Sequence, residues 1–260
     1  MSMIYAVANQ KGGVGKTTTT VNLAACLAEK KKKVLMVDID PQGNATSGFG
    51  LDKDSQLITT YEVILEENSA EEATQYIKDF KLAIIPSNMN LAGAEVELIG
   101  IDHREMRLQE ALKPIRDKYD YILIDCPPSL SMLTVNALCA CDAVIVPLQC
   151  EYFALEGLTQ LINTVNLVKK RLNPRIEIEG IVFTMYDNRT NLSNQVVEEV
   201  RNYMPDKVYE TLIPRNIRLG EAPSYGLPII YYDDKSKGAE SYRDLAAEVI
   251  KRSRKRNKNR

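Results

Sequence analysis

The stretch at residues 9–18, Asn-Gln-Lys-Gly-Gly-Val-Gly-Lys-Thr-Thr, constrains the fold more than any other part of the chain. It follows a short apolar run of strand length, residues 3–8, and overlaps residues 16–31, whose apolar side chains recur at helical spacing. A strand, a glycine-rich loop and a helix in this order form a P-loop, in which backbone N–H groups turn toward a phosphate. The positive N-terminal end of the helix strengthens the attraction for anions. The pattern therefore predicts a nucleotide site near the start of the chain.

Individual residues of this loop have predictable tasks. Lys16 is expected to reach the outer phosphates of ATP, and the hydroxyl of Thr17 to bind Mg²⁺. The other expected nucleotide-contacting positions of the loop are Gly12, Gly13, Val14, Gly15 and Thr18. The loop departs from the standard pattern because Gln10 stands where the first glycine is usual, and a second lysine, Lys11, follows it. A cradle within one subunit does not need Lys11, so we predict that Lys11 reaches into the nucleotide of a partner.

Strand-like and helical segments alternate along the rest of the chain. A helical stripe covers residues 152–172, and another helical segment lies near 103–117. Apolar strand-like runs occupy residues 34–37, 82–85, 121–124, 143–146 and 176–183, with a shorter one near Val208. This alternation predicts an α/β fold of the P-loop NTPase type, a doubly wound, mostly parallel sheet with helices on both faces. We expect a single domain over residues 1–250, with ligands at the carboxyl ends of the strands.

Two further motifs place carboxylates at that ligand-bearing edge. Asp38 and Asp40 end the apolar strand at 34–37, and alternation along a strand puts both on the same side. A carboxylate there can orient an attacking water or hold Mg²⁺ through its hydration shell. The alternative is an ordinary strand-ending turn with a helix cap. Asp125 ends the run at 121–124 in a Walker B pattern and is expected to bind Mg²⁺ through water.

Composition excludes several other classes of protein. Hydrophobic residues make up 45% and charged residues 26%, as in an ordinary soluble globular protein. No apolar run approaches the ~18 residues of a membrane span. The five cysteines are scattered through apolar segments and read as reduced, buried thiols, which predicts a cytoplasmic protein. His103 is the sole histidine, so a His-based metal site or a Ser-His triad is excluded.

The C-terminal segment is strongly basic. Residues 251–260 carry seven Lys or Arg and no acid, and without them 26 basic residues would face 35 acidic ones. We expect a disordered tail here. It serves either as a solvated segment that aids solubility or as an electrostatic arm for nucleic acid.

Taken together, these motifs resemble the ParA/MinD group of deviant-Walker ATPases. The resemblance is carried by residues 11–18, by Val-Asp-Ile-Asp-Pro-Gln-Gly-Asn at 37–44 and by Ile-Asp-Cys-Pro-Pro-Ser at 124–129. Residues 149–157 and 213–226 are similar to the chromosomal ParA (Soj) branch, and the likeness runs from about residue 3 to residue 250.

The resemblance implies a role for each part of the site. Lys11 would cross a dimer interface to the phosphates of the other subunit, so that ATP and Mg²⁺ make dimerisation nucleotide-dependent. Asp40 would position the attacking water, and Asp38 would support the shell of the metal. Pro214 and Asn216 match the segment that lines the adenine pocket in this family. Hydrolysis at such a site is expected to be slow until a partner completes it.

The resemblance also implies partners. Arg189 and Arg218 fall where ParA proteins carry arginines that contact double-stranded DNA without base reading. A ParB-type protein would stimulate hydrolysis, and the protein would be nucleoid-associated, without a membrane partner. One alternative is a MinD-like ATPase that positions cargo on another surface, although the basic end of the chain has no apolar face for lipid. Another is an enzyme of the same superfamily with reductive or ligase chemistry, for which Cys126 is the nearest cysteine to the site.

Overall fold

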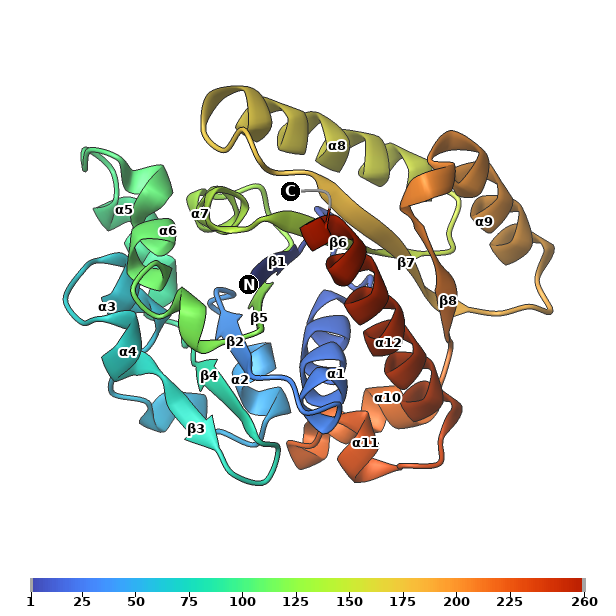
Figure 1. Ribbon diagram of the computed structural model, residues 1–260, viewed down its shortest axis with the longest axis horizontal. Coiled ribbons are helices and arrows are strands. Elements are labelled where there is room, and N and C mark those ends of the chain that lie inside the picture. Colours follow the sequence, from blue (N-terminus) through green and yellow to red (C-terminus); the bar gives the residue numbers. More distant parts are fainter. Residues whose placement is uncertain (1, 259–260) are drawn as a thin grey trace.

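The computed structural model describes the backbone of residues 2–258 and the side chains of residues 2–256 (Figure 1). An eight-stranded sheet crosses the molecule in the order β3-β4-β2-β5-β1-β6-β7-β8. The strands are β1 (Met3–Val7), β2 (Val34–Asp38), β3 (Gln75–Ile77), β4 (Leu82–Ile85), β5 (Tyr121–Asp125), β6 (Ala143–Gln149), β7 (Ile178–Tyr186) and β8 (Val208–Pro214). All neighbouring strands are parallel except β3 and β4. The predicted mostly parallel α/β sheet is confirmed.

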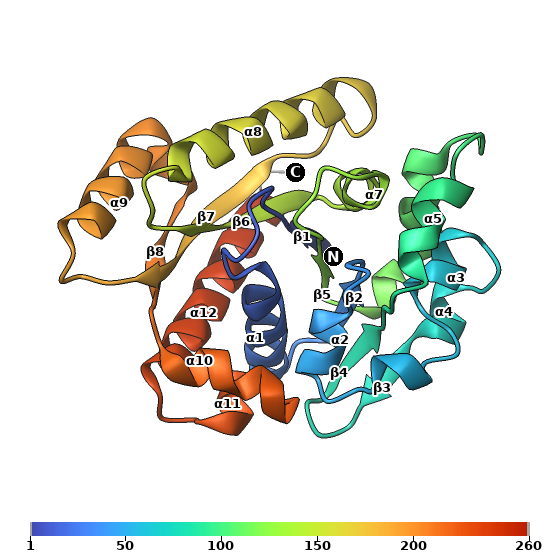
Figure 2. The ribbon, with the colours of Figure 1, turned by 180° about the vertical axis from the view of Figure 1, so that it is seen from behind.

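Helices cover both faces of the sheet, because alternate residues of a buried strand point to opposite sides. On β1, Ile4 and Ala6 belong to one core, and Met3, Tyr5 and Val7 to the other. The face of Tyr5 is covered by α1 (Lys16–Glu29), α2 (Asn44–Gly48), α10 (Ile217–Glu221), α11 (Ile229–Tyr232) and α12 (Lys237–Lys258). The opposite face is covered by α3 (Thr60–Ile64), α4 (Ala70–Ala73), α5 (Leu91–Glu97), α6 (Arg107–Leu112), α7 (Met132–Ala140), α8 (Ala154–Arg171) and α9 (Asn191–Tyr203) (Figures 1 and 2).

The register of the central strands brings three strand ends together. Asp125 at the end of β5 is paired with Val7 of β1 on one side and with Asp38 of β2 on the other. The loop after β1 therefore begins beside both acidic residues. In a parallel sheet this edge is where ligands bind.

Two elements differ from the sequence-based expectation. The helical segment predicted near 103–117 is an α-helix over Arg107–Leu112 only, flanked by 3₁₀ turns at Arg104–Met106 and Arg116–Lys118. Pro114 accounts for the early end, because proline lacks an N–H group and its ring clashes with the preceding turn. The charged stretch before β4 contains β3, an edge strand of three residues that is too short to give a pattern in the sequence.

The prediction of a disordered tail is wrong for residues 251–258, which continue α12. Ser253 is 2% exposed, and its Oγ lies 2.7 Å from the hydroxyl of Tyr121. Arg256 forms ion pairs with Glu177 and Glu179 at 2.8 and 3.0 Å. The basic end is therefore docked on the protein by acidic partners from β7 and the residue preceding it. Residues 259–260 of the predicted tail lie outside the described residues.

The part of α12 before residue 251 packs on the core. Tyr242, Leu245, Ala246 and Val249 are all buried there. None of the helices in the described part of the chain is long and apolar enough to cross a membrane.

Candidate nucleotide-binding site

The loop between β1 and α1 turns at two glycines. Gly13 and Gly15 have φ angles of 73° and 83°, in the left-handed region that glycine enters without strain. Gly15 is also the N-cap of α1, so the first N–H groups of the helix face the loop and have no partner within the helix. This arrangement forms a cradle for an anion.

Lys16 lies in this cradle and is unusually buried for a lysine. The residue is 7% exposed, and its Nζ donates a hydrogen bond to the carbonyl of Lys11 at 2.9 Å. Burial lowers the pKa of the Lys16 ammonium group. No ion pair to Lys16 occurs among residues 2–256. A buried ammonium group without a carboxylate partner is unfavourable by itself, and phosphate oxygens would satisfy it.

Asp125 is held in one orientation by two hydroxyl groups of α1. Thr17 Oγ1 donates to Asp125 Oδ2 at 2.8 Å, and Thr20 Oγ1 lies 2.7 Å from Oδ1. Asp125 is fully buried at the end of β5. Burial, together with the neighbouring Asp38, raises the pKa of Asp125 to about 8.

Asp38 and Asp40 lie at the same strand end but have different surroundings. Asp38 is fully buried, and its Oδ2 accepts hydrogen bonds from the backbone N–H and the hydroxyl of Thr46, both at 2.8 Å. Burial raises the pKa of Asp38. Asp40 is 7% exposed and accepts a hydrogen bond from the N–H of Gln42 at 2.9 Å. Asp38 thus orders the start of α2, whereas Asp40 has free acceptor capacity at the edge.

The residues around Thr17 fit a magnesium–nucleotide complex. No three His, Cys, Asp or Glu side chains converge into a metal cluster in the part of the chain that the structure describes. Mg²⁺ keeps several waters and takes phosphate oxygens alongside one or two protein ligands, so a protein cage is not required. The Thr17 hydroxyl would bind the metal, and Asp125 would hold it through water.

Lys11 projects from the loop and is partly exposed. Its Nζ forms an ion pair with Glu151, which lies between β6 and α8. Asn9 fixes the backbone below it, since Asn9 Oδ1 accepts from Lys11 N at 3.0 Å and Asn9 Nδ2 donates to the carbonyl of Pro147 at 2.8 Å. The sequence-based reasoning assigned no role to Glu151, which is acidic and two residues beyond the end of β6.

A cavity of about 340 Å³ lies beside the loop. Its lining includes the predicted residues Gly15, Thr18, Pro214 and Asn216. The structure therefore brings the loop and the segment after β8 together, although they are far apart in the sequence. The apolar part of the cavity lining suits the flat aromatic base of a nucleotide.

Several residues of this cavity were missed from the sequence. They are Thr184, Met185, Arg215, Ile217, Leu219, Gly220 and Tyr242, together with Ile213. Thr184 and Met185 are among the last three residues of β7, at the ligand-bearing edge, a position that could have indicated them. Thr184 Oγ1 also donates to the carbonyl of Val14 at 2.8 Å, which joins β7 to the loop. Nothing in the sequence around Tyr242 indicated its place here.

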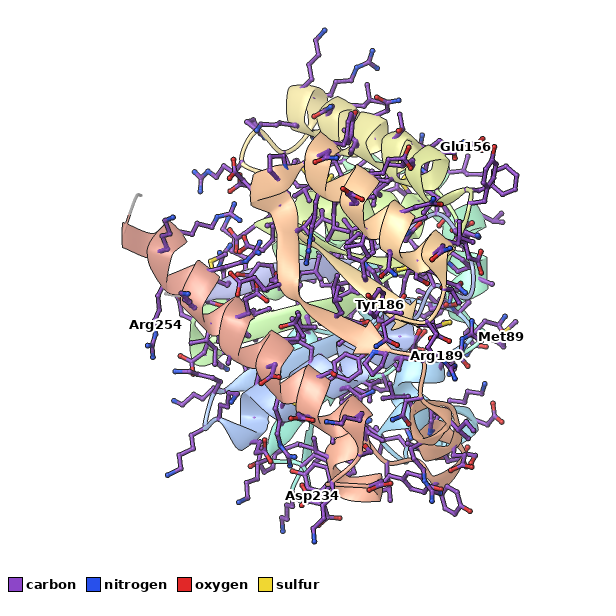
Figure 3. All side chains as sticks on the ribbon, turned by 90° about the vertical axis from the view of Figure 1, so that its right-hand side faces the viewer. Met89, Glu156, Tyr186, Arg189, Asp234 and Arg254 are labelled. Atoms are coloured by element: carbon purple, nitrogen blue, oxygen red, sulfur yellow. The ribbon has the colours of Figure 1, made fainter. Side chains whose placement is uncertain are left out.

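The two arginines predicted to contact DNA are exposed and lie outside this cavity. Arg189 donates two hydrogen bonds to the carboxylate of Asp187, at 2.9 and 2.7 Å. Arg218 forms ion pairs with Glu221 at 2.9 Å and with Asp233 at 3.4 Å. Figure 3 shows Arg189 next to Tyr186 at the end of β7. Each guanidinium already has a carboxylate partner within the chain.

Comparison with known proteins decides the family. The AAA domain family AAA_31 matches residues 2–178. The "Sporulation initiation inhibitor protein Soj" of Bacillus subtilis is 57% identical over 249 residues, with 96% of this chain and 98% of Soj covered. The "Chromosome partitioning protein ParA" of Myxococcus xanthus is 54% identical over 249 residues, with 96% and 88% covered. The chain belongs to the ParA/MinD family of ATPases.

A solved structure agrees with this assignment. The crystal structure of "Cobyrinic Acid a,c-diamide synthase" from Mycobacterium smegmatis, with bound ADP and magnesium, has a TM-score of 0.86 and 38% sequence identity. The match covers 98% of this chain and 96% of that one. The predicted family, the P-loop fold and the cofactors ATP and Mg²⁺ are thus confirmed. This ParA/MinD-family protein is an ATP-hydrolysing enzyme of the partitioning type.

Proposed function

We propose that the protein is an ATP-controlled switch for chromosome or plasmid partitioning. With ATP bound, two copies form a sandwich dimer that binds DNA without sequence preference. Slow hydrolysis, stimulated by a ParB-type protein, then releases the DNA. The observation that carries this proposal is the place of Lys11, a surplus cation on the exposed rim of a phosphate cradle that Lys16 already completes within one subunit.

The surroundings of Lys11 support a dimer across this edge. Apolar side chains follow the carboxyl ends of β4, β5 and β6 and lie in solvent. They are Met89, Leu130, Tyr152 and Phe153, which are 56%, 48%, 79% and 61% exposed. Exposed apolar side chains beside a ligand site are typical of an interface. A second copy, related by a two-fold axis, would cover them and bring its own Lys11 to this nucleotide.

The catalytic roles follow from the geometry of the acidic residues. We assign the orientation of the attacking water to Asp40, whose side chain keeps free acceptor capacity. Lys16 and Lys11 would stabilise the charge on the transferring phosphoryl group. The Thr17 hydroxyl would bind Mg²⁺, Asp125 would hold the metal through water, and Asp38 would support its hydration shell. Hydrolysis that stays slow until a partner contributes a further group is suited to a timed switch.

DNA contact through Arg189 and Arg218 is supported by their exposure and charge. Arg215, which is exposed and forms no ion pair in the described part of the chain, lines a cavity with Arg189 and adds to the same surface. Phosphates would compete with Asp187, Glu221 and Asp233 for these guanidinium groups. One copy would therefore bind weakly, and the dimer, with two such surfaces, more tightly. Contacts to the backbone give binding that weakens with salt and ignores sequence.

The test is binding to a random-sequence duplex at low and moderate salt, with ATP·Mg²⁺, with ADP·Mg²⁺ and without nucleotide. We expect markedly tighter, salt-sensitive binding with ATP. Lys16→Ala should abolish nucleotide binding and with it the gain in DNA affinity. Arg189→Glu should dimerise on ATP and lose that gain. Equal DNA affinity in all three nucleotide states would disprove the switch.

The other candidate functions receive less support. A MinD-like attachment to lipid would need an apolar face at the end of α12, but the apolar residues of that helix are buried on the core. A liposome flotation assay would test for attachment to lipid. A cluster shared between subunits would need an accessible cysteine, whereas Cys126 is fully buried.

A further inference from the structure

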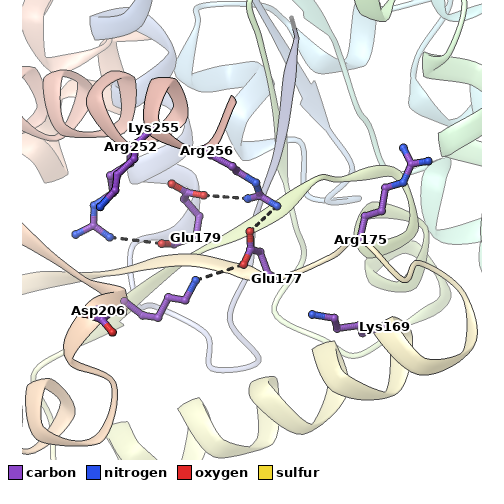
Figure 4. Close-up of a pocket in the computed structure, with 9 residues that line it drawn as sticks. Lys169, Arg175, Glu177, Glu179, Asp206, Arg252, Lys255 and Arg256 are labelled. Carbon is purple, nitrogen blue, oxygen red and sulfur yellow. Dashed lines mark hydrogen bonds and ion pairs between the residues drawn. The ribbon is translucent and has the colours of Figure 1, made fainter. Parts of the chain in front are cut away.

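A second cavity lies at the edge of the sheet opposite the nucleotide site. It is formed where β7 begins and α12 ends, and its volume is about 730 Å³ (Figure 4). Six basic side chains line it: Lys169, Arg175, Lys207, Arg252, Lys255 and Arg256. Three acidic side chains lie among them. The cavity is therefore a local excess of positive charge in a protein whose net charge is −2.

Half of these cations are used to hold the structure together. Arg256 is paired with Glu177 and Glu179, as described above, and Lys207 lies 3.5 Å from Glu177. Arg252 Nη2 donates to Glu248 at 2.8 Å and also contacts the carbonyl of Val208. These contacts pair the half-buried Glu177 and the buried Glu179 with cations, and they fix the end of α12. Glu177 and Glu179 are thus neutralised within the chain, whereas Asp206 is exposed and forms no ion pair among residues 2–256.

The other three cations are available to a ligand. Lys169 at the end of α8, Arg175 before β7 and Lys255 on α12 are exposed. None of the three forms an ion pair within the described part of the chain. In Figure 4 no dashed line reaches Lys169 or Arg175. Three separate elements therefore present unpaired positive charge around one opening.

Positive charge extends beyond the cavity along both helices. Four further exposed residues that form no ion pair among residues 2–256 continue it: Lys170 and Arg171 on α8, and Lys251 and Arg254 on α12. We call these four residues together with Lys169, Arg175 and Lys255 the opposite-edge patch. Figure 3 places Arg254 and Arg189 on opposite sides of the molecule. The patch is thus separate from the surface around Arg189.

We propose that the opposite-edge patch binds the phosphate backbone of a second DNA duplex. The cations are spread over α8, α12 and the segment before β7, around an open cavity. They do not converge on one enclosed point, which matches phosphates repeated along a backbone. Exposed lysines and arginines suit phosphate contact without base reading. With patches at opposite edges, one molecule can bridge two DNA segments. The inference takes nucleic acid as the partner from the proposed function, but it requires neither ATP nor dimerisation.

The test uses two triple variants of the full-length protein. K169Q/R175Q/K255Q removes the unpaired cations of the cavity and keeps Arg252 and Arg256, so the anchor of α12 stays intact. The matched control, K30Q/K33Q/K78Q, removes three exposed lysines at the same edge, beside β2 and β4, that have no ion-pair partner in the described part of the chain. Equal midpoints of thermal unfolding establish that all three proteins are folded alike. Binding to a random duplex is then measured without nucleotide, as a function of salt.

We expect the cavity variant to bind the duplex about tenfold more weakly at low salt, and its plot of log affinity against log salt to be less steep by roughly two to three. The control should change less than twofold. In a second assay with ATP, a duplex on beads should capture a labelled free duplex through the wild-type protein and not through the cavity variant.

Three results would overturn the inference: no DNA binding by the nucleotide-free wild-type protein at low salt, equal binding by the cavity variant and the control, or displacement of the duplex by inorganic tripolyphosphate equimolar to the protein. The last would assign the cavity to a small polyphosphate. Failure of the proposed function would look different from failure of this inference. The DNA affinity of the wild-type protein would then not change on addition of ATP.

Discussion

Lys11 Nζ and the carboxylate of Glu151 form an ion pair within one chain, with side chains 38% and 43% exposed. We assign Lys11 to the nucleotide of a partner subunit. In the isolated chain, however, Lys11 is paired with Glu151 of its own subunit. An exposed pair of this kind contributes about 0–1 kcal/mol. The pair is weak enough for the phosphates of the nucleotide in a second subunit to replace Glu151. Breaking it adds a small free-energy cost to dimerisation.

Glu151→Gln should therefore dimerise more readily with ATP. Removal of the competing carboxylate is expected to tighten the dimer by up to about fivefold, which corresponds to ~1 kcal/mol, with little change in stability. Sedimentation velocity with ATP·Mg²⁺ across a range of concentrations measures the effect. The matched control is Glu156→Gln, since Glu156 is exposed on α8 and is not ion-paired with any residue whose side chain the structure describes. Unchanged or weaker dimerisation of Glu151→Gln would show that the pair does not oppose assembly.

Asp40→Asn should leave a long-lived ATP dimer. Asparagine keeps an oxygen for the N–H of Gln42 but cannot orient or deprotonate water as a carboxylate does. We expect hydrolysis to fall by about 10²–10⁴-fold, with nucleotide affinity within a few fold of wild type. Phosphate release and size-exclusion chromatography with ATP measure the two properties. If the variant remained monomeric with ATP, or hydrolysed ATP at the wild-type rate, the role of Asp40 would be wrong.

Magnesium–nucleotide binding should become tighter as pH rises from 7 toward 8. Burial and Asp38 raise the pKa of Asp125 to about 8, so at pH 7 the free protein retains a proton that Mg²⁺ must displace. Affinity then increases until the carboxyl group is ionised and levels off above that pH. Calorimetry in two buffers of different ionisation enthalpy should detect about one proton released. Asp125→Asn should bind Mg²⁺–ATP without this pH dependence; its persistence there would assign the proton to another group.

Arg256→Gln should loosen the end of α12. The substitution leaves Glu179, which is 8% exposed, without its cation, and breaking a buried pair costs about 3–5 kcal/mol. Because Glu177 is 41% exposed, we expect the lower end of that range. Thermal unfolding should show the loss, and hydrogen exchange should increase over residues 251–256. Lys251→Gln, on the exposed side of the same helix, should do neither. Unchanged exchange in Arg256→Gln would mean that Ser253 and the apolar face suffice to dock the helix.

The sequence by itself determined the nucleotide site and the sheet that carries it. Glycines at 13 and 15, Lys16 and Thr17 act within a few residues of one another, and Asp38 and Asp125 end apolar runs, so local geometry predicts where they lie. The parallel sheet follows for the same reason, since the central strands β1, β2, β4 and β5 are buried on both faces and are apolar up to their last residue.

Contacts between distant segments were decided only by the tertiary structure. The pairing of Lys11 with Glu151, the place of Tyr242 in the cavity beside Gly15, and the anchoring of Arg256 by Glu179 each join residues that are far apart in the chain. The basic end looked disordered because a run of like charges repels itself in isolation. Its acidic partners lie at the start of β7, and no periodicity within residues 251–260 could reveal them. A local sequence pattern reflects interactions within one segment. The tertiary structure determines which charged residues of other segments lie beside it.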